Sequence, residues 1–529
     1  MHLSKLFIEN FRLFGSQEDG NHLDLDLTPG LNVVVGENDS GKSAVIDAIR
    51  YVLWTTSFEY HRFTDDDFHV IGENRTENIT IQVKFSDLLR QEQARFLEWL
   101  SIEDDETCLF ITLKATRHDD ETGGRARRRR ISVKTRSGKN GEGPPIEGEI
   151  REFLRTTYLR PLRDAERELT SGRGSRLSQI LQSHPDYTDQ ETDNFSESEP
   201  TSDDLTLAGI LSRTDHDIQR NAFILSVQEE INDEYLEQFS IGEDILEGEI
   251  GVGRQTELRY VLEKLELWLR SKPGIDIRTR RGLGYNNVLF MATELLLLAG
   301  EEQGALPLLL IEEPEAHLHP QLQLRLMEFL QSRSNERDSE NNDEELSNPV
   351  QILVTTHSPN LASVVNLEKI IFMHKGEAYP LASDFTRLDP LDYRFLERFL
   401  DVTKANLFFA KGVVIVEGDA ENILLPAFAK SIDRSFSAHG VSIVNVGTKG
   451  LFRYSRVFQR SEGGDMPINV ACVADRDVVP EPVDYRQGEK ESDLSTDELE
   501  QKEQKLREED TDTIFLRKSR AFLLVTAKV

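Results

Sequence analysis

Two glycines, a lysine and a serine near the start of the chain have the spacing of a phosphate-binding loop. The stretch GENDSGKS at positions 36–43 fits the pattern G-x-x-x-x-G-K-S. In such a loop the backbone N–H groups turn toward phosphate oxygens, the lysine neutralises the β and γ phosphates, and the serine ligates Mg²⁺. We therefore expect ATP with Mg²⁺ to bind at Gly36, Asn38, Gly41, Lys42 and Ser43, with Ser43 as a metal ligand.

Polar residues that follow two later apolar runs would complete an ATPase site. The run LPLLLIEE ends in Glu312, which we expect to hold the Mg²⁺ shell, and Glu313, which we expect to polarise the attacking water. TTHSP places His357 where it can sense the γ-phosphate or that water, although an isolated histidine is as often structural. A glycine-backed helix start offers further N–H groups to a phosphate. Its residues are Gly282, Gly284 and Asn286.

A second set of carboxylates lies near the far end of the chain. In VVIVEGDAE, Glu417 follows an apolar run and Glu421 comes one helical turn later, and INVACVADRD ends in Asp475 and Asp477. Residues at i and i+2 of an extended segment face the same way, so the aspartates can converge. Convergent carboxylates repel one another without a cation, and hard oxygen ligands suit Mg²⁺ or Mn²⁺. We expect all four to ligate metal and Glu417, Asp475 and Asp477 to be catalytic; a solvated turn is the alternative for each motif alone.

These residues need strands and helices to position them. The apolar run 31–36 reads as a buried strand before the phosphate loop, and Ile46, Ile49 and Leu53 follow it at helical spacing. Later residues predict a second, smaller parallel sheet, because apolar runs alternate with helical patterns. Its strands are expected at 413–416, 441–446 and 468–474, and its helices at 420–430 and 451–459. The chain stops on the strand-like RAFLLVTAKV, so we expect the last domain to be incomplete.

Composition limits the partners and the compartment. The 529 residues suggest three or four domains, and a formal net charge of −33 argues against a general basic coat for polyanions. Contact with DNA must then be local, and the basic residues at 125–136 are the candidates, with a solvated loop as the alternative. They are Arg125, Arg127 to Arg130, Lys134 and Arg136. No apolar run approaches the ~20 residues of a membrane span, no secretory signal is evident, and two cysteines suit the cytoplasm.

The order of phosphate loop, glycine-rich signature, Glu-Glu strand and switch histidine resembles an ATP-binding-cassette (ABC) ATPase of the structural-maintenance and recombination-repair type. The opening IENFRLFG resembles the start of that group, which implies that Arg12 lies near the nucleotide. The signature departs from the transporter form LSGGQ, so a transporter role is disfavoured. The family geometry implies that one subunit closes on another, as a homodimer or a larger even-numbered assembly.

The Glu and Asp-x-Asp motifs resemble the Toprim domain of topoisomerases, primases and certain nucleases, in which they bind divalent metal and act on phosphodiesters. No separate module with a nucleophilic tyrosine and no polymerising part is evident, which leaves hydrolytic cleavage. ABC ATPase and Toprim together resemble the overcoming-lysogenization-defect (OLD) family, which includes the nuclease subunit of the Gabija anti-phage system and some retron effectors. The resemblance implies an α/β fold in four parts. They are an ABC ATPase part at 1–165, a helical dimerisation insertion at 166–255, a second ATPase part at 256–400 and a Rossmann-like Toprim domain at 405–529.

The activity that this resemblance implies is an ATP-regulated, metal-dependent DNA endonuclease with a role in anti-phage defence. Family members carry further Toprim elements, which would fall past Val529, so this chain is expected to bind DNA yet cleave poorly. Two alternatives stay open. One is a non-cleaving ATP-dependent DNA clamp of the repair type, and the other is an effector that stays silent until a helicase or a retron nucleic acid activates it.

Overall fold

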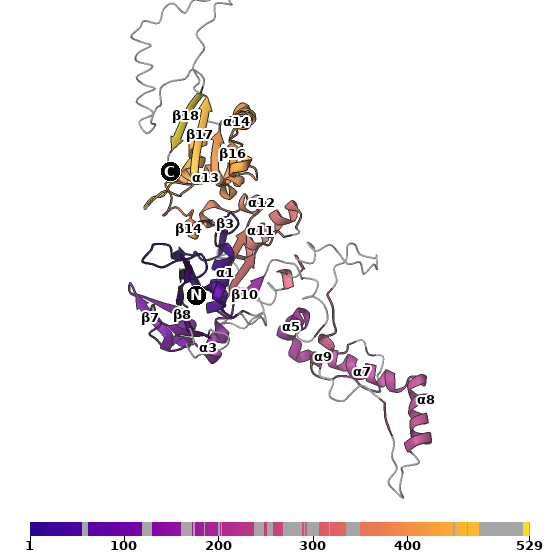
Figure 1. The fold of residues 1–529 in the computed structure, drawn as a ribbon. Helices are drawn as coiled ribbons and strands as arrows, with labels where there is room; N and C mark the ends of the chain where they lie inside the picture. The colour runs from indigo at the N-terminus through magenta and orange to yellow at the C-terminus, as the bar shows by residue number, and fades with distance from the viewer. Residues whose placement is uncertain are drawn as a thin grey trace, which may run out of the picture.

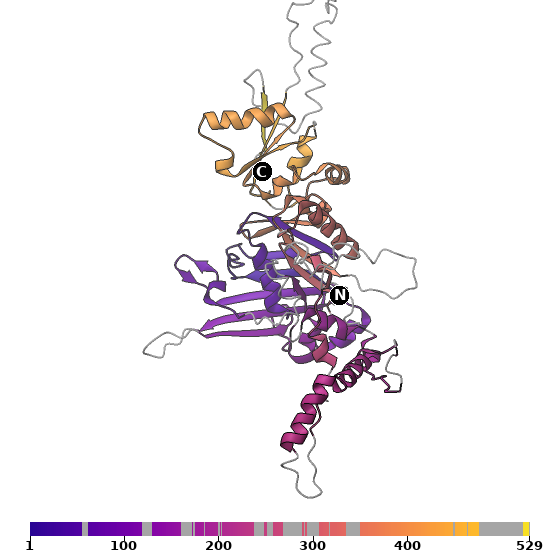
Figure 2. The ribbon, with the colours of Figure 1, turned by 90° about the vertical axis from the view of Figure 1, so that its right-hand side faces the viewer.

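The structure is a computed structural model that describes most of the chain. The described residues are 1–55, 62–118, 130–159, 172, 175–184, 186–198, 202, 204–236, 248–250, 258–267, 288–289, 291–293, 306–316, 318–334, 350–447, 450–462, 464–475 and 522–527. They form an α/β body with a smaller sheet domain at one end and a helical arm at the other (Figures 1 and 2).

A six-stranded sheet positions the phosphate loop. Its strand order is β10-β11-β12-β3-β13-β14, and every pair is parallel except β13 with β14. Strands β3 and β12 are buried along their whole length because both faces of the sheet are covered. The strands are β10 (Thr157–Leu159), β11 (Leu308–Glu312), β12 (Gln351–Thr356), β3 (Leu31–Gly36), β13 (Ile370–His374) and β14 (Glu377–Pro380). Helices α1 (Lys42–Val52), α11 (Pro320–Ser334) and α12 (Pro359–Ala362) flank them.

An antiparallel sheet lies against the other side of α1. Its order is β2-β1-β6-β8-β7, and β9 also pairs with β8. The inward side chains of β6 alternate with half-exposed ones and share a core with α1, so one face is apolar and the other polar. The strands are β1 (His2–Glu9), β2 (Leu23–Asp26), β6 (Asn78–Ser86), β7 (Leu100–Glu103), β8 (Glu106–His118) and β9 (Arg130–Ser137). Smaller elements are β4 (Val70–Ile71), β5 (Asn74–Arg75), α2 (Arg90–Arg95) and α3 (Gly148–Phe153).

A helical arm extends from the body where the insertion is predicted (Figures 1 and 2). Side-chain oxygens begin three of its helices: Ser175 accepts from the N–H of Ser178, Thr206 from Gly209 and Asn221 from Phe223. The helices are α5 (Arg176–Ser183), α6 (Tyr187–Gln190), α7 (Leu207–Gln219) and α8 (Ala222–Glu230), followed by a π-helical segment (Ile231–Leu236) and α9 (Leu258–Leu262). The limits of the predicted domains stay predictions.

The third sheet forms the end domain, with strand order β16-β15-β17-β18. The first three strands are parallel, as predicted, but β18 pairs antiparallel with β17, so the sheet is mixed. Its elements are β15 (Gly412–Val416), α14 (Asp419–Ser431), β16 (Val441–Asn445), α15 (Leu451–Arg456), β17 (Asn469–Asp475) and β18 (Phe522–Ala527). Helix α13 (Pro390–Phe399) precedes them, and one continuous apolar core joins this domain to the ATPase sheet. Within the described residues, no helix has the length and apolar character to cross a membrane.

Candidate active sites

The phosphate loop has a backbone that only glycine adopts easily. Gly36 has a φ of 150°, and a Cβ built there would come 2.2 Å from the carbonyl oxygen of Met373. Gly41 has a φ of 111°, and a Cβ there would lie 3.2 Å from the Cε of Met373. The loop connects β3 to the start of α1, where Asn38 and Ser43 are exposed. A buried strand, a glycine-dependent turn and an open helix N-terminus fit a bound phosphate chain.

Lys42 is folded into this loop and is only 4% exposed. Its Nζ donates to the carbonyl oxygens of Gly36, at 2.9 Å, and of Glu37, and to the Oγ of Ser40 at 3.2 Å. Burial lowers the pKa of Lys42 to about 8, although the nearby Glu313 carboxylate favours the charged form. The ammonium group is thus held at the loop by neutral oxygen acceptors, which leaves its charge for an anionic ligand.

Glu312 lies at the end of β11 and has a partner on the neighbouring strand. The hydroxyl of Tyr158 donates to Oε2 of Glu312 at 2.7 Å. The guanidinium carbon of Arg50 lies 3.6 Å from the centre of the Tyr158 ring, in a cation–π contact. Burial raises the pKa of Tyr158 far above its usual value, so the phenol stays a hydrogen-bond donor. The sequence reasoning did not identify Tyr158.

Glu313 and His357 face each other across the ends of β11 and β12. Nε2 of His357 lies 3.3 Å from Oε1 of Glu313. The backbone of Glu313 has a φ of 46°, and its N–H donates to the carbonyl oxygen of Thr355 at 2.9 Å. Such left-handed backbone at a non-glycine residue costs about 1–3 kcal/mol and often marks a functional site. Burial, and next the charge of Lys42, lower the pKa of His357, which keeps its ring neutral near pH 7.

Glu315 is a further carboxylate of this site that the sequence reasoning missed. Its Oε1 accepts from the hydroxyl of Thr356 at 2.8 Å and from the backbone N–H of His357 at 2.6 Å. Burial raises its pKa, although these hydrogen bonds oppose the shift. The signal was present in the sequence as the third acidic residue of EEPE, but only the fold shows that Glu315 accepts a hydrogen bond from the backbone of His357.

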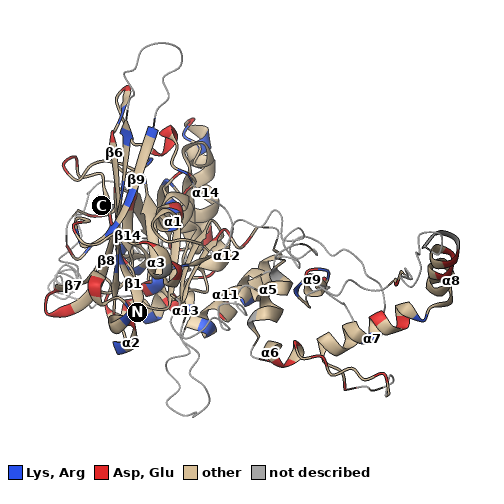
Figure 3. Ribbon diagram, turned by 90° about the horizontal axis from the view of Figure 1, so that it is seen from below, with Lys and Arg blue, Asp and Glu red and all other residues tan. Residues whose placement is uncertain are grey.

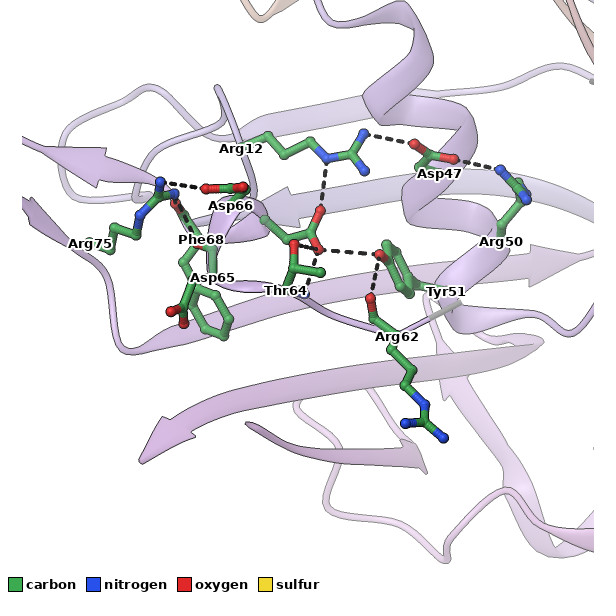
Figure 4. A network of polar contacts seen from close by, with 11 residues as sticks. Arg12, Asp47, Arg50, Tyr51, Arg62, Thr64, Asp65, Asp66, Phe68 and Arg75 are labelled. Carbon is green, nitrogen blue, oxygen red and sulfur yellow. Dashed lines mark hydrogen bonds and ion pairs between the residues drawn. The ribbon is translucent and has the colours of Figure 1, made fainter. Parts of the chain in front are cut away.

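Arg12 is held in a network of carboxylates beside α1 (Figure 4). Its Nη1 donates to Oδ2 of Asp47 at 2.7 Å, and its Nε donates to Oδ1 of Asp67 at 3.0 Å. The other oxygen of Asp47 accepts from Nη1 of Arg50 at 2.7 Å. Asp47 lies on α1, four residues after Ser43, so the network anchors Arg12 to the helix that begins at the phosphate loop. A contact between Arg12 and the nucleotide stays a prediction.

The second candidate site is the carboxyl edge of the end domain. Val416 of β15 pairs with Asn445 of β16 and with Val473 of β17, so the three parallel strands end at one edge. Glu417 follows Val416, and its N–H donates to the carbonyl oxygen of Val473 at 3.3 Å. Asp475 ends β17 at the same edge. The register therefore brings Glu417 and Asp475 to the place where open α/β sheets bind ligands.

Two residues beside Glu417 have partners of their own. Oδ1 of Asp419 accepts from the side-chain amide of Asn445 at 2.6 Å, which adds Asn445 to the residues that sequence reasoning missed. Glu421 is 5% exposed, and its Oε2 accepts from the N–H of Gly418 at 3.0 Å, as a cap of α14. The role of Glu421 as a metal ligand stays a prediction. The alternative is that its carboxylate only caps α14.

Several predicted residues fall outside the described part of the chain. They are Gly282, Gly284, Asn286, Asp477, Arg125 and Arg127 to Arg129, and the side chain of Asp475. Within the described residues, no group of three or more His, Cys, Asp or Glu side chains could hold a metal ion. Glu417 and Glu421 are the two predicted Toprim ligands whose side chains are described.

Two parts of the chain match known protein families. Residues 1–122 and 155–362 match the family described as AAA ATPase domain, and residues 408–477 match the family described as overcoming lysogenization defect protein-like, TOPRIM domain. Among solved structures, an SMC head bound to the C-terminal winged-helix domain of ScpA covers 72% of this chain and 96% of its own. It is 16% identical with a TM-score of 0.39, a score too low to bear on the fold of this chain.

Curated relatives match most of the chain. The OLD nuclease of Thermus scotoductus is 25% identical over 468 residues, which cover 84% of this chain and 77% of the relative. Endonuclease GajA of Bacillus cereus strain VD045 is 22% identical over 460 residues, which cover 84% of this chain and 71% of the relative. With an AAA ATPase domain over more than half of its residues and an OLD-like TOPRIM domain after it, the chain belongs to the AAA ATPase family and is similar over most of its length to the OLD nuclease and to endonuclease GajA.

Proposed function

We propose that this protein is an ATP-regulated, divalent-metal-dependent endonuclease that cleaves DNA in defence against phage. The observation that carries the proposal is the strand register that brings Glu417 and Asp475 to one edge of the end domain. Acidic residues at the ends of neighbouring parallel strands can supply oxygen ligands to one hard cation. The relatives named OLD nuclease and Endonuclease GajA support the substrate class and the defence role.

The proposed cleavage site uses the chain's own carboxylates to hold the metal. Glu417, Asp475 and Asp477 would provide the ligands, and Mg²⁺ or Mn²⁺ would supply an activated water and stabilise the leaving oxygen of the phosphodiester. The side-chain amide of Asn445 orients Asp419 next to Glu417. This hydrogen bond keeps one more acidic side chain directed at the same edge.

At the ATPase site, Lys42 and the N–H groups of the loop would bind the phosphates. Ser43 and Glu312 are the proposed ligands of the nucleotide's metal, and Glu313 is the proposed acceptor of a hydrogen bond from the attacking water. The neutral ring of His357 lies against Glu313. In the proposed mechanism this ring would sense the γ-phosphate or the attacking water. ATP binding or turnover at this site would set the conformation that permits cleavage.

The outer face of β8 and β9 is the proposed contact with DNA. Lys114 lies directly opposite Lys134, and Arg130 and Arg136 lie on the same face of β9 as Lys134 because side chains alternate along a strand. Figure 3 shows the basic segments of β9 in blue. All four side chains are exposed, and none makes an ion pair within the part of the chain that the structure describes. Like charges directly opposite on neighbouring strands destabilise a sheet, which favours a polyanionic partner.

The proposed assembly is a homodimer, or a larger even-numbered oligomer, joined through the helical arm. Large apolar side chains are exposed on α7 and α8, with Phe223 at 71%. They are Ile210, Phe223 and Leu225. A second copy of the arm would cover them. Light scattering of Phe223→Ser should then show a smaller particle, whereas Leu97→Ser, with a similarly exposed apolar residue outside the arm, should not.

A plasmid-nicking assay tests the proposed function. Supercoiled DNA is incubated with the full-length protein and Mg²⁺ or Mn²⁺, with and without ATP, beside the full-length variants Glu417→Gln and Asp475→Asn. Glu397→Gln, which removes an exposed carboxylate on α13, is the control. Nicking that both site variants lose and the control keeps would support the nuclease, and the ATP comparison would give the sign of regulation.

Two other outcomes would replace the proposal. ATP-dependent DNA binding without nicking in any metal would favour a non-cleaving clamp. Nicking that starts only when a helicase or a retron nucleic acid is added would favour an effector that a partner activates.

A further inference from the structure

A line of polar contacts runs from the N-terminal loop to Glu312. Arg12 bonds to Asp47, Asp47 to Arg50, and Arg50 stacks on Tyr158, whose hydroxyl donates to Glu312 at 2.7 Å. Figure 4 shows the outer part of this line, with Asp47 between the two arginines. Arg50 is buried and Asp47 is partly buried, so these contacts are shielded from water far better than surface pairs.

Strand register explains why Tyr158 reaches Glu312. Tyr158 of β10 pairs with Leu310 of β11 in a parallel ladder, so the two side chains point to the same face of the sheet. Glu312 is two residues beyond Leu310 and therefore points to that face as well. This face packs against α1, because Tyr158 and Leu310 share a core cluster with the apolar side chains of α1. Arg50 projects from α1 onto the ring.

We propose that Tyr158 is a positioning residue that orients the Glu312 carboxylate for the metal of the bound nucleotide. Its hydroxyl donates to Oε2 and so restricts rotation of the carboxylate, and Oε1 would then be the oxygen that Glu312 offers to the metal. The guanidinium of Arg50 packs on the face of the Tyr158 ring, and Arg50 in turn donates a hydrogen bond to Asp47. Hydrogen bonds to a metal ligand of this kind typically change metal affinity about 10- to 100-fold.

The competing interpretation is that Tyr158 only fills space between β10 and α1. Tyr158→Phe separates the two, because phenylalanine keeps the ring and its contact with Arg50 and removes one hydroxyl. A packing role predicts no change in metal dependence. Tyr379→Phe is the matched control, since the hydroxyl of Tyr379 also donates to a glutamate, Glu377, and both residues lie on β14 at the opposite edge of the same sheet.

The experiment measures nucleotide binding with a fluorescent ATP analogue, first in EDTA and then with increasing Mg²⁺. For Tyr158→Phe we expect unchanged affinity in EDTA and a roughly 10-fold or larger increase in the Mg²⁺ concentration that gives half of the metal-dependent tightening. Glu312→Gln should show the same defect. Adding Tyr158→Phe to Glu312→Gln should then change nothing more, because the two residues act on one interaction.

The inference rests on the nucleotide site and not on the nuclease, and the outcomes separate the two. An unchanged Mg²⁺ requirement in Tyr158→Phe, or an equal loss of affinity in EDTA and in Mg²⁺, would overturn the positioning role alone. A wild-type protein whose nucleotide binding ignores Mg²⁺ would overturn the metal assignment of Glu312, and the inference with it. The test measures nucleotide binding only, so its result does not depend on whether the protein nicks plasmid DNA.

Discussion

Oε1 of Glu313 lies 3.3 Å from Nε2 of His357, at the ends of adjacent parallel strands. Burial lowers the pKa of His357, so at neutral pH the contact joins a carboxylate to a neutral imidazole and not to a cation. A neutral partner leaves the carboxylate with acceptor capacity for a water molecule. Glu315 holds the backbone of the same histidine, which fixes the pair in place.

Glu313→Gln should abolish ATP hydrolysis while keeping ATP binding. The amide has nearly the same shape but cannot take up a proton, so we expect turnover to fall about 10²- to 10⁴-fold. Phosphate release gives the rate, and a fluorescent nucleotide gives the affinity. Glu328→Gln, at an exposed position of α11, is the control. Near-normal hydrolysis by Glu313→Gln would show that another group positions the water.

The affinity for ATP should decrease at alkaline pH because of Lys42. Burial lowers its pKa to about 8 in the free protein, and bound phosphates raise it again. Below pH 8 the lysine is charged with or without ATP, so affinity is constant. Above about pH 8 the free site loses its proton and binding must take one up, so affinity falls toward about tenfold per pH unit.

Titrations in EDTA between about pH 7 and about pH 9.5 measure this dependence, because this range spans the shifted pKa. Calorimetry in buffers of different ionisation enthalpy measures the proton taken up. Lys42→Arg, which stays charged throughout this range, should bind more weakly with a flat profile. Constant affinity in the wild type, or proton release on binding, would contradict the lowered pKa.

Sequence reasoning succeeded where function depends on neighbouring positions and failed where it depends on long-range register. The strands before Glu312, His357 and Glu417 were predicted because a buried strand appears in the sequence as a short apolar run. The residue at the end of such a strand can be read from the same few neighbouring positions. Tyr158 was missed because its partner lies 154 positions away and meets it only through the β10–β11 ladder. The antiparallel pairing of β18 was missed for the same reason, since an apolar run does not encode its direction.

Gly36→Ala should remove nucleotide binding by displacing the phosphate loop. The added Cβ would come 2.2 Å from the carbonyl oxygen of Met373, so β3 and β13 must move apart. Gly72→Ala is the matched control, because Gly72 also has a positive φ but nothing lies within 4 Å of its added Cβ. Strain alone predicts a loss of about 1–2 kcal/mol of stability in the control and normal ATP binding. Normal ATP binding by Gly36→Ala would contradict this geometry.

Replacing Lys114 and Lys134 with glutamine should weaken DNA binding and stabilise the fold. Each phosphate contact contributes about 0.9 to the slope of log affinity against log salt, so the double variant should lose about 2 from that slope. Removing two opposed like charges should also raise the free energy of unfolding slightly. Lys139→Gln is the control, since Glu103 already neutralises Lys139. An unchanged slope would place the DNA elsewhere.

Glu421 has two proposed roles, as a cap of α14 and as a metal ligand, and two substitutions at this position separate them. As the cap of α14, its Oε2 accepts from the N–H of Gly418, and the side-chain oxygen of glutamine can accept the same bond. Glu421→Gln should therefore keep the stability of the end domain, whereas Glu421→Ala should lose about 0.5–2 kcal/mol. The rate of plasmid nicking measures the role as a metal ligand, because an amide is a poorer ligand for Mg²⁺ than a carboxylate. We expect Glu421→Gln to nick poorly at normal stability, and full nicking by this variant would assign Glu421 to the cap alone.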